Sequence, residues 1–151
     1  MLNRKALKDI SILLVSQDKG ILDKVRKLID SFGVEQIECT ESYEEAVELA
    51  CRQKRRFDLV IASLKFDGDT QTGIEICRRI KAEDPRTLCL IFSEVYRDTD
   101  LLNLLSFNID GIVDTANMMK IMSKWVSVLT KKKTLQNIIS GTVHFEELHA
   151  G

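Results

Sequence analysis

The stretch Phe57-Asp58-Leu59-Val60-Ile61-Ala62-Ser63-Leu64 is a run of apolar residues entered from a polar turn. A short run of this kind, bounded by polar residues, is typical of a strand that is buried on both faces of a sheet. A polar loop, Lys65 to Gln71, follows it, and a helical pattern begins near Thr72. A buried strand, a loop and an amphipathic helix in this order predict one βα unit of a parallel sheet.

The same alternation extends over most of the chain. Five apolar runs predict strands, at Ser11–Val15, Val34–Thr40, Asp58–Ser63, Leu88–Phe92 and Ile109–Val113. Between and after them, the spacing of apolar residues predicts helices over Ile21–Phe32, Ser42–Ala50, from Thr72, Leu101–Phe107 and from Asn117 onward. Local signals support these limits: Gly33 ends the first helix, and Ser42 with Glu45 forms a capping box. Right-handed crossovers then place helices on both faces of the sheet.

Length and composition exclude several classes of protein. The 151 residues suit one domain, and 44% apolar with 30% charged residues suits a globular one. A formal net charge of −1 provides no field that would attract nucleic acid or an anionic membrane. No apolar run reaches the length of about 18 residues that a membrane span needs, and the start lacks the apolar core of a signal peptide.

The four cysteines do not form a metal-binding pattern. None belongs to a CxxC pair, and both histidines lie far away in the tail, so we expect no zinc site. Each cysteine lies beside apolar residues on a predicted strand or helix. We therefore expect reduced cysteines that pack as small hydrophobic residues, in a cytoplasmic protein.

Five βα units in this order resemble the receiver domain of response regulators in two-component signalling. The matching segments are Ile12–Val15, Phe57–Ile61, Gly73–Glu75, Leu88–Ser93 and Asp110–Val113. The resemblance implies a flavodoxin-like α/β fold, a doubly wound (βα)5 three-layer sandwich around a five-stranded parallel sheet. It also implies a receiver-like domain over residues 9–130, followed by a C-terminal extension or the start of a linker over residues 131–151. In such folds ligands bind at the carboxyl ends of the strands.

In the receiver family, five groups at that edge carry out phosphoryl transfer. Two acids and an acceptor aspartate hold a magnesium ion, and a hydroxyl and a lysine contact the phosphoryl group. The matching residues here are Ser16 and Gln17 for the acids, Ser63 for the acceptor, Ser93 for the hydroxyl and Thr115 for the lysine. Of these five residues, only Ser93 has the kind of side-chain group, a hydroxyl, that the family has at the matching position. The resemblance therefore implies a degenerate pseudo-receiver that is not an enzyme and has no catalytic residue, no cofactor and no magnesium site.

The predicted fourth helix has more apolar residues than one buried face requires. Its residues Leu101, Leu104 and Phe107, together with Ile112 where the family has an aromatic residue, would form a surface for a protein partner or a homodimer. In receivers this face is built by helix four, strand five and helix five. The alternative is that the helix is simply more deeply buried. We expect a signalling module that acts through protein–protein interaction and binds neither nucleic acid nor membrane.

Two other interpretations stay open at this stage. The first is a receiver that is phosphorylated or regulated by a ligand at a non-standard site. Asp67 and Asp69 could substitute for the missing metal-holding acids, and Lys65 is either a group that binds an anion there or a solvated loop lysine. Asp18 fits better as the cap of the first helix. The second is a small-ligand-binding α/β domain or enzyme that uses the same strand-end crevice. Against this, the chain contains no P-loop, no GxGxxG motif and no evident pair of nucleophile and base.

Overall fold

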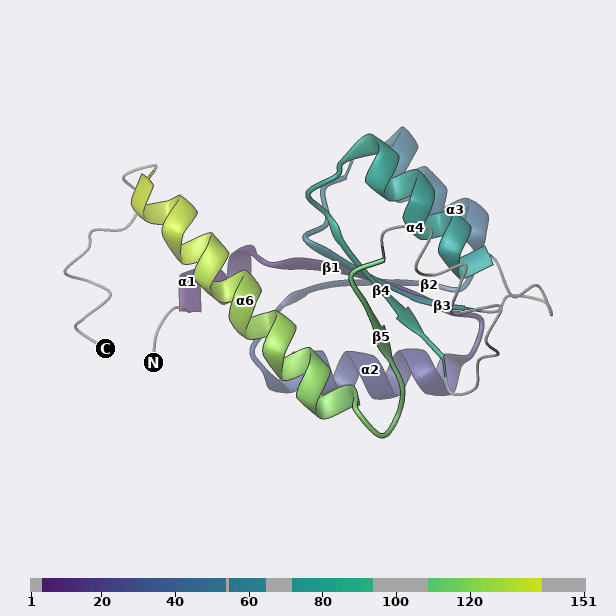
Figure 1. The fold of residues 1–151 in the computed structure, drawn as a ribbon, viewed down its shortest axis with the longest axis horizontal. Helices are drawn as coiled ribbons and strands as arrows, with labels where there is room; N and C mark the ends of the chain where they lie inside the picture. The colour runs from purple at the N-terminus through teal and green to yellow at the C-terminus, as the bar shows by residue number, and fades with distance from the viewer. Residues whose placement is uncertain (1–3, 54, 65–71, 94–108, 140–151) are drawn as a thin grey trace.

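Five parallel strands form one sheet in the computed structural model, which describes residues 4–53, 55–64, 72–93 and 109–139 (Figure 1). The strands are β1 (Ser11–Val15), β2 (Gln36–Thr40), β3 (Leu59–Ser63), β4 (Leu88–Phe92) and β5 (Gly111–Val113). Their order across the sheet is β2-β1-β3-β4-β5. The chain thus moves outward in one direction from β1 to β2 and in the other from β3 to β5. The carboxyl ends of β1 and β3 lie at this change of direction, where doubly wound folds bind ligands.

Helices cover both faces of the sheet, as the strand–helix alternation predicted. In Figure 1, α2 (Lys19–Ser31) and α6 (Met118–Ile139) lie on one face, and α3 (Tyr43–Val47) and α4 (Thr72–Glu83) lie on the other. One π-helical turn, η1 (Glu48–Arg52), continues α3. The three-layer flavodoxin-like α/β fold is therefore confirmed.

The core consists of two apolar clusters that the sheet separates. Side chains of a strand alternate between the two faces, so each central strand contributes to both clusters. The cluster under α3 and α4 contains Leu13, Val15, Val60, Ala62, Cys89 and Ile91. The cluster under α2 and α6 contains Ile12, Leu14, Leu59, Ile61, Leu90 and Phe92. Because both faces are buried, these strands lack polar alternation, and this is why they appear in the sequence as continuous apolar runs.

Local signals in the sequence agree well with the observed helix ends. Asp18 caps α2, because its Oδ1 accepts from the backbone N–H groups of Gly20 (2.9 Å) and Ile21 (3.1 Å). Gly33, just past α2, has a φ of 95°, which favours glycine. The capping box formed only in part: Ser42 Oγ accepts from Glu45 N at 3.0 Å, but Ser42 N donates to Thr40 Oγ1 instead of to the Glu45 carboxylate.

The ends of several helices and strands differ from the sequence prediction. β2 and β5 each begin two residues later than predicted, although Val34 before β2 is fully buried. A short helix, α1 (Arg4–Asp9), precedes β1 and was not predicted. The last helix, α6, continues to Ile139, and Lys133 within it pairs with Asp58 at 3.0 Å. The predicted helix over Leu101–Phe107 lies outside the described residues.

We expect the cysteines to divide into two classes in a thiol-labelling experiment. Cys77 and Cys89 are buried between α4 and β4, whereas Cys39 and Cys51 are half-buried. A hydrogen bond with Cys89, together with burial, raises the pKa of the Cys77 thiol well above its usual value. Ellman's reagent should therefore react before denaturation with Cys39 and, more slowly because burial raises the pKa of its thiol, with Cys51, and reach the other two only after denaturation. Rapid labelling of Cys77 in the native protein, located by peptide mass, would contradict the packing of α4 on β4.

Candidate functional site

Ser16 and Ser63 meet at the carboxyl edge of the sheet. Ser63 is the last residue of β3, and Ser16 directly follows β1, whose last residue, Val15, lies opposite Ala62. This register brings the two serines together, and Ser63 Oγ donates a hydrogen bond to Ser16 Oγ at 2.7 Å. Both side chains are buried, with Ser63 only 8% exposed. Two of the five residues predicted for the phosphorylation pocket are thus in direct contact.

Further hydrogen bonds hold Ser16 in place. Its backbone N–H donates to the carbonyl of Thr40 at 3.1 Å, and its Oγ also accepts from the backbone N–H of Asp18 at 3.1 Å. The Asp18 carboxylate is in turn engaged with the first turn of α2. Asp18 therefore serves as the helix cap that the sequence predicted, and its carboxylate is not a replacement acid for the pocket.

The other three predicted residues lie along the same edge. Ser93 follows β4, is buried, and donates its backbone N–H to the carbonyl of Val113 at 2.9 Å. Gln17 and Thr115 are exposed. Thr115 lies in the turn before α6, which Asp114 and Asn117 close by donating backbone N–H groups to each other's side chains at 2.7 and 2.8 Å. All five residues thus lie at, or just past, the carboxyl ends of strands.

Sequence reasoning missed the role of Gly73. This glycine lies in the first turn of α4, where an added Cβ would be 2.0 Å from the carbonyl oxygen of Ser63 and 3.1 Å from Leu64 Cα. The backbone of α4 thus rests directly on the end of β3, and the position has no room for any side chain. The signal was present, because Gly73 opens the segment Gly73–Glu75 that supported the family resemblance, but close packing cannot be inferred from that segment alone.

The chemistry of this site does not suit magnesium. Mg²⁺ takes hard, preferably charged oxygen ligands, whereas Ser16, Gln17 and Ser63 carry neutral groups. The two serine hydroxyls are also already bonded to each other. In the described residues, no cluster of three or more His, Cys, Asp or Glu side chains has the geometry of a metal site. The apolar void beneath the serine pair is about 10 Å³, which is roughly the space of one water molecule.

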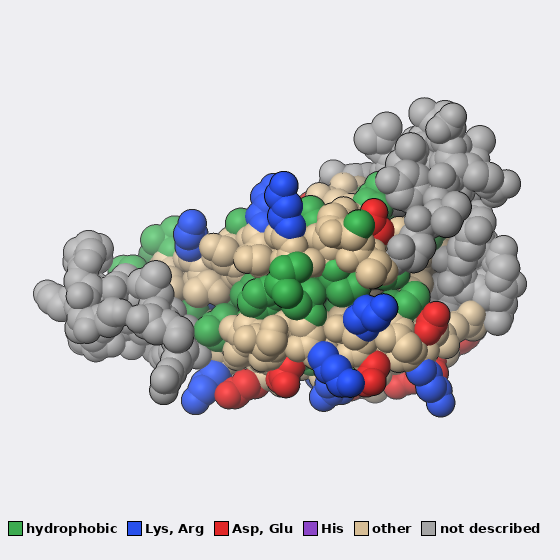
Figure 2. All heavy atoms as spheres, turned by 90° about the horizontal axis from the view of Figure 1, so that it is seen from below, with side chains coloured by type: hydrophobic (Ala, Val, Ile, Leu, Met, Phe, Trp, Pro, Cys, Tyr) green, Lys and Arg blue, Asp and Glu red, His purple; other side chains and the backbone are tan. Residues whose placement is uncertain are grey.

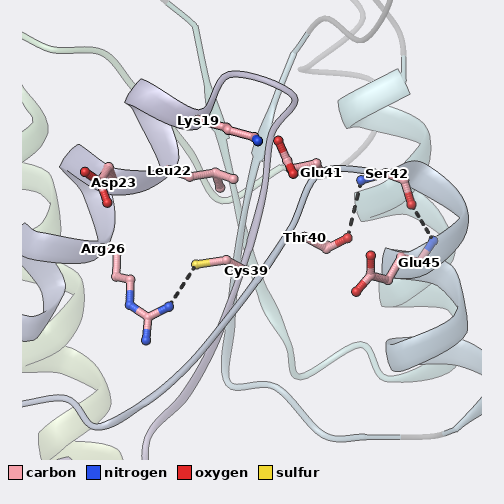
Figure 3. Close-up of a pocket in the computed structure, with 9 residues that line it drawn as sticks. All are labelled: Lys19, Leu22, Asp23, Arg26, Cys39, Thr40, Glu41, Ser42 and Glu45. Carbon is pink, nitrogen blue, oxygen red and sulfur yellow. Dashed lines mark hydrogen bonds between the residues drawn. The ribbon is translucent and has the colours of Figure 1, made fainter.

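A second cavity, which the sequence did not predict, lies beside the edge strand β2. It has a volume of about 380 Å³ and lies between α2 and the turn from β2 into α3. Figure 3 shows the charged ends of Lys19 and Glu41 facing each other, while Arg26 points across to Cys39, with 3.7 Å between Nη1 and Sγ. The lining groups carry both charges and are mostly exposed. This open groove is where a small ligand would bind if the chain were a ligand-binding domain.

Part of the predicted partner surface falls on residues that the structure does not describe. Leu101, Leu104 and Phe107 lie outside the described residues, as do Lys65, Asp67 and Asp69. Ile112 is described: it is in β5, half-buried, and packs against the cluster under α3 and α4. The helix-four face therefore stays a prediction.

The comparisons with known proteins agree with this geometry. A family model described as the response regulator receiver domain matches residues 12–138. The chain belongs to the receiver family. As a receiver domain it is a module of the two-component signalling type. No curated protein shows significant similarity to this receiver.

Solved receiver structures share the fold at low sequence identity. The signal receiver domain of an HD domain-containing protein from Pseudomonas fluorescens Pf-5 is 16% identical, with a TM-score of 0.70 over 85% of this chain and 91% of that one. A two-component response regulator from Clostridium difficile is 20% identical, with a TM-score of 0.67 over 82% and 97% of the two chains. The response regulator DrrB of Thermotoga maritima is 21% identical, with a TM-score of 0.66 over 82% of this receiver and 54% of DrrB.

Within the described part of the receiver, none of the helices combines the length and the apolar character that crossing a bilayer requires.

Proposed function

We propose that this receiver is a pseudo-receiver, which does not accept a phosphoryl group and acts through protein–protein interaction. The proposal rests above all on the contact between Ser63 and Ser16. At the end of β3, where the family reaction uses a carboxylate, the chain has a buried hydroxyl whose hydrogen bond goes to a second hydroxyl at 2.7 Å. A hydroxyl cannot form an acyl phosphate, and it is a weak nucleophile without an adjacent base.

The surroundings of Ser63 support the same conclusion. Its hydroxyl is bonded to another neutral hydroxyl, and both histidines of the chain lie in residues 140–151, outside the described part. Phosphoryl transfer depends on metal ions and charged groups that neutralise the developing charge. Neutral ligands at residues 16, 17 and 63 would provide little of that stabilisation. We therefore propose that the domain is not an enzyme and uses no magnesium cofactor.

The mode of signalling follows from the missing chemistry. A ligand shifts a conformational equilibrium only if it binds the two states with different affinity. Without a phosphoryl group at Ser63, no such ligand acts at this edge, so the domain would present one surface to its partners at all times. We propose a cytoplasmic location for this module, because free cysteines, two of them fully buried, suit a reducing compartment.

The test is incubation with acetyl phosphate and magnesium, read by intact-protein mass spectrometry. We expect no mass increase of one phosphoryl group in the wild-type chain, while a receiver that retains all three carboxylates gains one under the same conditions. The variant Ser63→Asp should also stay unlabelled, because Ser16 and Gln17 still leave the metal without charged ligands. A labelled wild type would contradict the proposal. Peptide mapping would then show whether the group is on Asp67 or Asp69, which is the alternative of a non-standard site.

The runner-up function, binding of a small ligand, receives less support. The groove beside β2 is open, and much of its lining is engaged with itself or its neighbours: Thr40 and Ser42 bond within the turn, and Asp23 pairs with Lys27 at 3.5 Å. Binding pockets are usually concave and mostly apolar, with a few converging polar groups. This groove lacks that character.

A further inference from the structure

The last helix extends beyond the sheet at the edge opposite the serine pair. Asp58 directly precedes β3, and its carboxylate accepts from the backbone N–H of Ser11 at 2.9 Å, so Asp58 marks the amino edge of the sheet. Lys133 of α6 pairs with this carboxylate at 3.0 Å. The six residues from Thr134 to Ile139 therefore continue past the strands by about 9 Å at 1.5 Å per residue. Figure 1 shows this end of α6 projecting from the sheet, with α1 beside it.

Exposed apolar side chains follow one another along the second half of α6, from Val128 to its projecting end at Ile139. Val128 is 42% exposed, Leu135 is 58% exposed and Ile139 is 77% exposed. At 100° per residue these three positions fall within about 40° of the helix circumference and span about 16 Å. Met119, which is 62% exposed, lies on the same helix about half a turn away from this stripe. The stripe is thus a defined feature and not a scatter of single residues.

Lysines border the stripe. From Met118 to Ile139 the helix contains five lysines and no acidic residue, although the whole chain has a net charge of −1. Lys124 and Lys131 are exposed and lie on one side of the stripe, and the half-buried Lys132 lies on the other. Figure 2, seen from the side of α2 and α6, shows a band of apolar side chains along the face, with Lys and Arg on both sides of it and with Asp and Glu among them mainly along one side. We name Val128, Leu135 and Ile139 with Lys124 and Lys131 the α6 surface.

The charge of the α6 surface decides which partner fits it. A second copy packed against the same stripe, in either direction, would bring the lysines of one α6 near those of the other, and α6 itself supplies no acid to compensate them. An amphipathic helix with an apolar face and acidic flanks would instead cover the stripe and pair with its lysines. We propose that the α6 surface docks an acidic amphipathic helix of a partner protein.

Docking at the α6 surface rests on the proposed function, interaction with a partner protein, and assigns that interaction to a defined part of the domain. Leu135 and Ile139 of the α6 surface lie past the amino edge, whereas the serine pair is at the carboxyl edge, so docking does not require chemistry at Ser63. Three apolar side chains cannot bury the roughly 1,000 Å² of a stable interface by themselves. The complex is therefore a transient one, and its affinity falls with salt.

The experiment measures binding of a designed peptide to the full chain by fluorescence anisotropy. The probe is a labelled helix of about 20 residues with leucines at i, i+3, i+4 and i+7 and glutamates on both flanks. We expect saturable binding that weakens about tenfold or more between roughly 50 and 300 mM salt. A second peptide, with lysine in place of each glutamate, should not bind.

Two matched variants locate the site. Leu135→Glu should weaken binding of the acidic peptide by about tenfold or more, since it removes the centre of the stripe and adds a repelling charge. Met119→Glu makes the same change at an equally exposed position of the same helix and should leave binding unchanged. Equal melting temperatures of both variants, followed by circular dichroism, establish that folding is not the cause of a difference.

Three outcomes would overturn the proposal. The first is equal binding by both variants or by both peptides. The second is a dimer in sedimentation velocity that Leu135→Glu dissociates, which would assign the surface to a second copy. The third is pelleting with phosphatidylserine vesicles that Leu135→Glu abolishes while no peptide binds, which would assign it to a membrane. None of these results depends on the phosphorylation test, so failure of the docking proposal is distinguishable from failure of the pseudo-receiver proposal.

Discussion

Replacing Gly73 with alanine is expected to lower the free energy of unfolding by about 3 kcal/mol, a large part of the stability of a typical domain. A Cβ at this position would lie 2.0 Å from the Ser63 carbonyl oxygen and 2.8 Å from its carbon. Both atoms belong to the backbone of β3, so no flexible side chain can move aside to relieve the clash. Either α4 or the end of β3 must shift, and that shift also displaces the Ser63 hydroxyl.

Denaturant unfolding followed by far-UV circular dichroism measures the effect. Gly20→Ala is the control, because the nearest atom to its new Cβ would be Asp18 Oδ1 at 3.1 Å, at the end of a short side chain. Alanine in place of glycine within a helix is otherwise favourable by about 1 kcal/mol, so this variant should be nearly as stable as the wild type or more stable. Equal stability of the two variants would show that α4 does not rest on β3 as described.

Replacing Asp110 with alanine is expected to lower the free energy of unfolding by about 2 kcal/mol or more. Asp110 Oδ2 accepts from Lys81 Nζ at 2.9 Å and from the backbone N–H of Cys89 at 2.7 Å. The variant would leave an ammonium group that is only 13% exposed without its counter-ion, and a strand N–H without its acceptor. Because water reaches part of both side chains, the loss should be smaller than for a fully buried pair.

The same unfolding assay separates charge from hydrogen bonding. Asp110→Asn keeps an oxygen that can accept from Cys89 and removes only the charge, so about half of the loss should remain. The double variant Asp110→Ala with Lys81→Met no longer has the unpaired ammonium group. Its loss in the free energy of unfolding should therefore be smaller than that of Asp110→Ala alone. A double variant that loses the full sum of both single effects would mean that the two groups do not interact in solution.

The sequence predicted the sheet because parallel strands buried on both faces leave a simple pattern. Ser11–Val15 and Leu88–Phe92 were predicted residue for residue, since each is a short apolar run with polar limits. β2 and β5 were placed correctly but too long at their starts. Val34 and Ile109 are apolar because they pack against the core, and packing does not require them to belong to the hydrogen-bonded ladder.

The candidate site was predictable in position but not in detail. The order of βα units places Ser16, Ser63 and Ser93 on one edge, because the carboxyl ends of parallel strands meet there. The hydrogen bond between Ser16 and Ser63 depends on the register of β1 against β3, and the contact of Gly73 depends on how closely α4 approaches. The pair Lys133–Asp58 joins residues far apart in the sequence. Such contacts arise from tertiary packing, which local patterns do not encode.

The position of α6 at the end of the described chain has a consequence for how the protein matures in the cell. Met122, Val126 and Leu129 of α6 complete the cluster that covers one face of the sheet, whose strands all precede them in the chain. A ribosome therefore makes every strand before it makes the helix that shields them. Until α6 emerges, the apolar side chains of β1, β3 and β4 on that face lack this cover, and nascent chains with such surfaces are prone to aggregation. The demand of this protein on chaperones should therefore fall mainly in the short interval before its last helix docks.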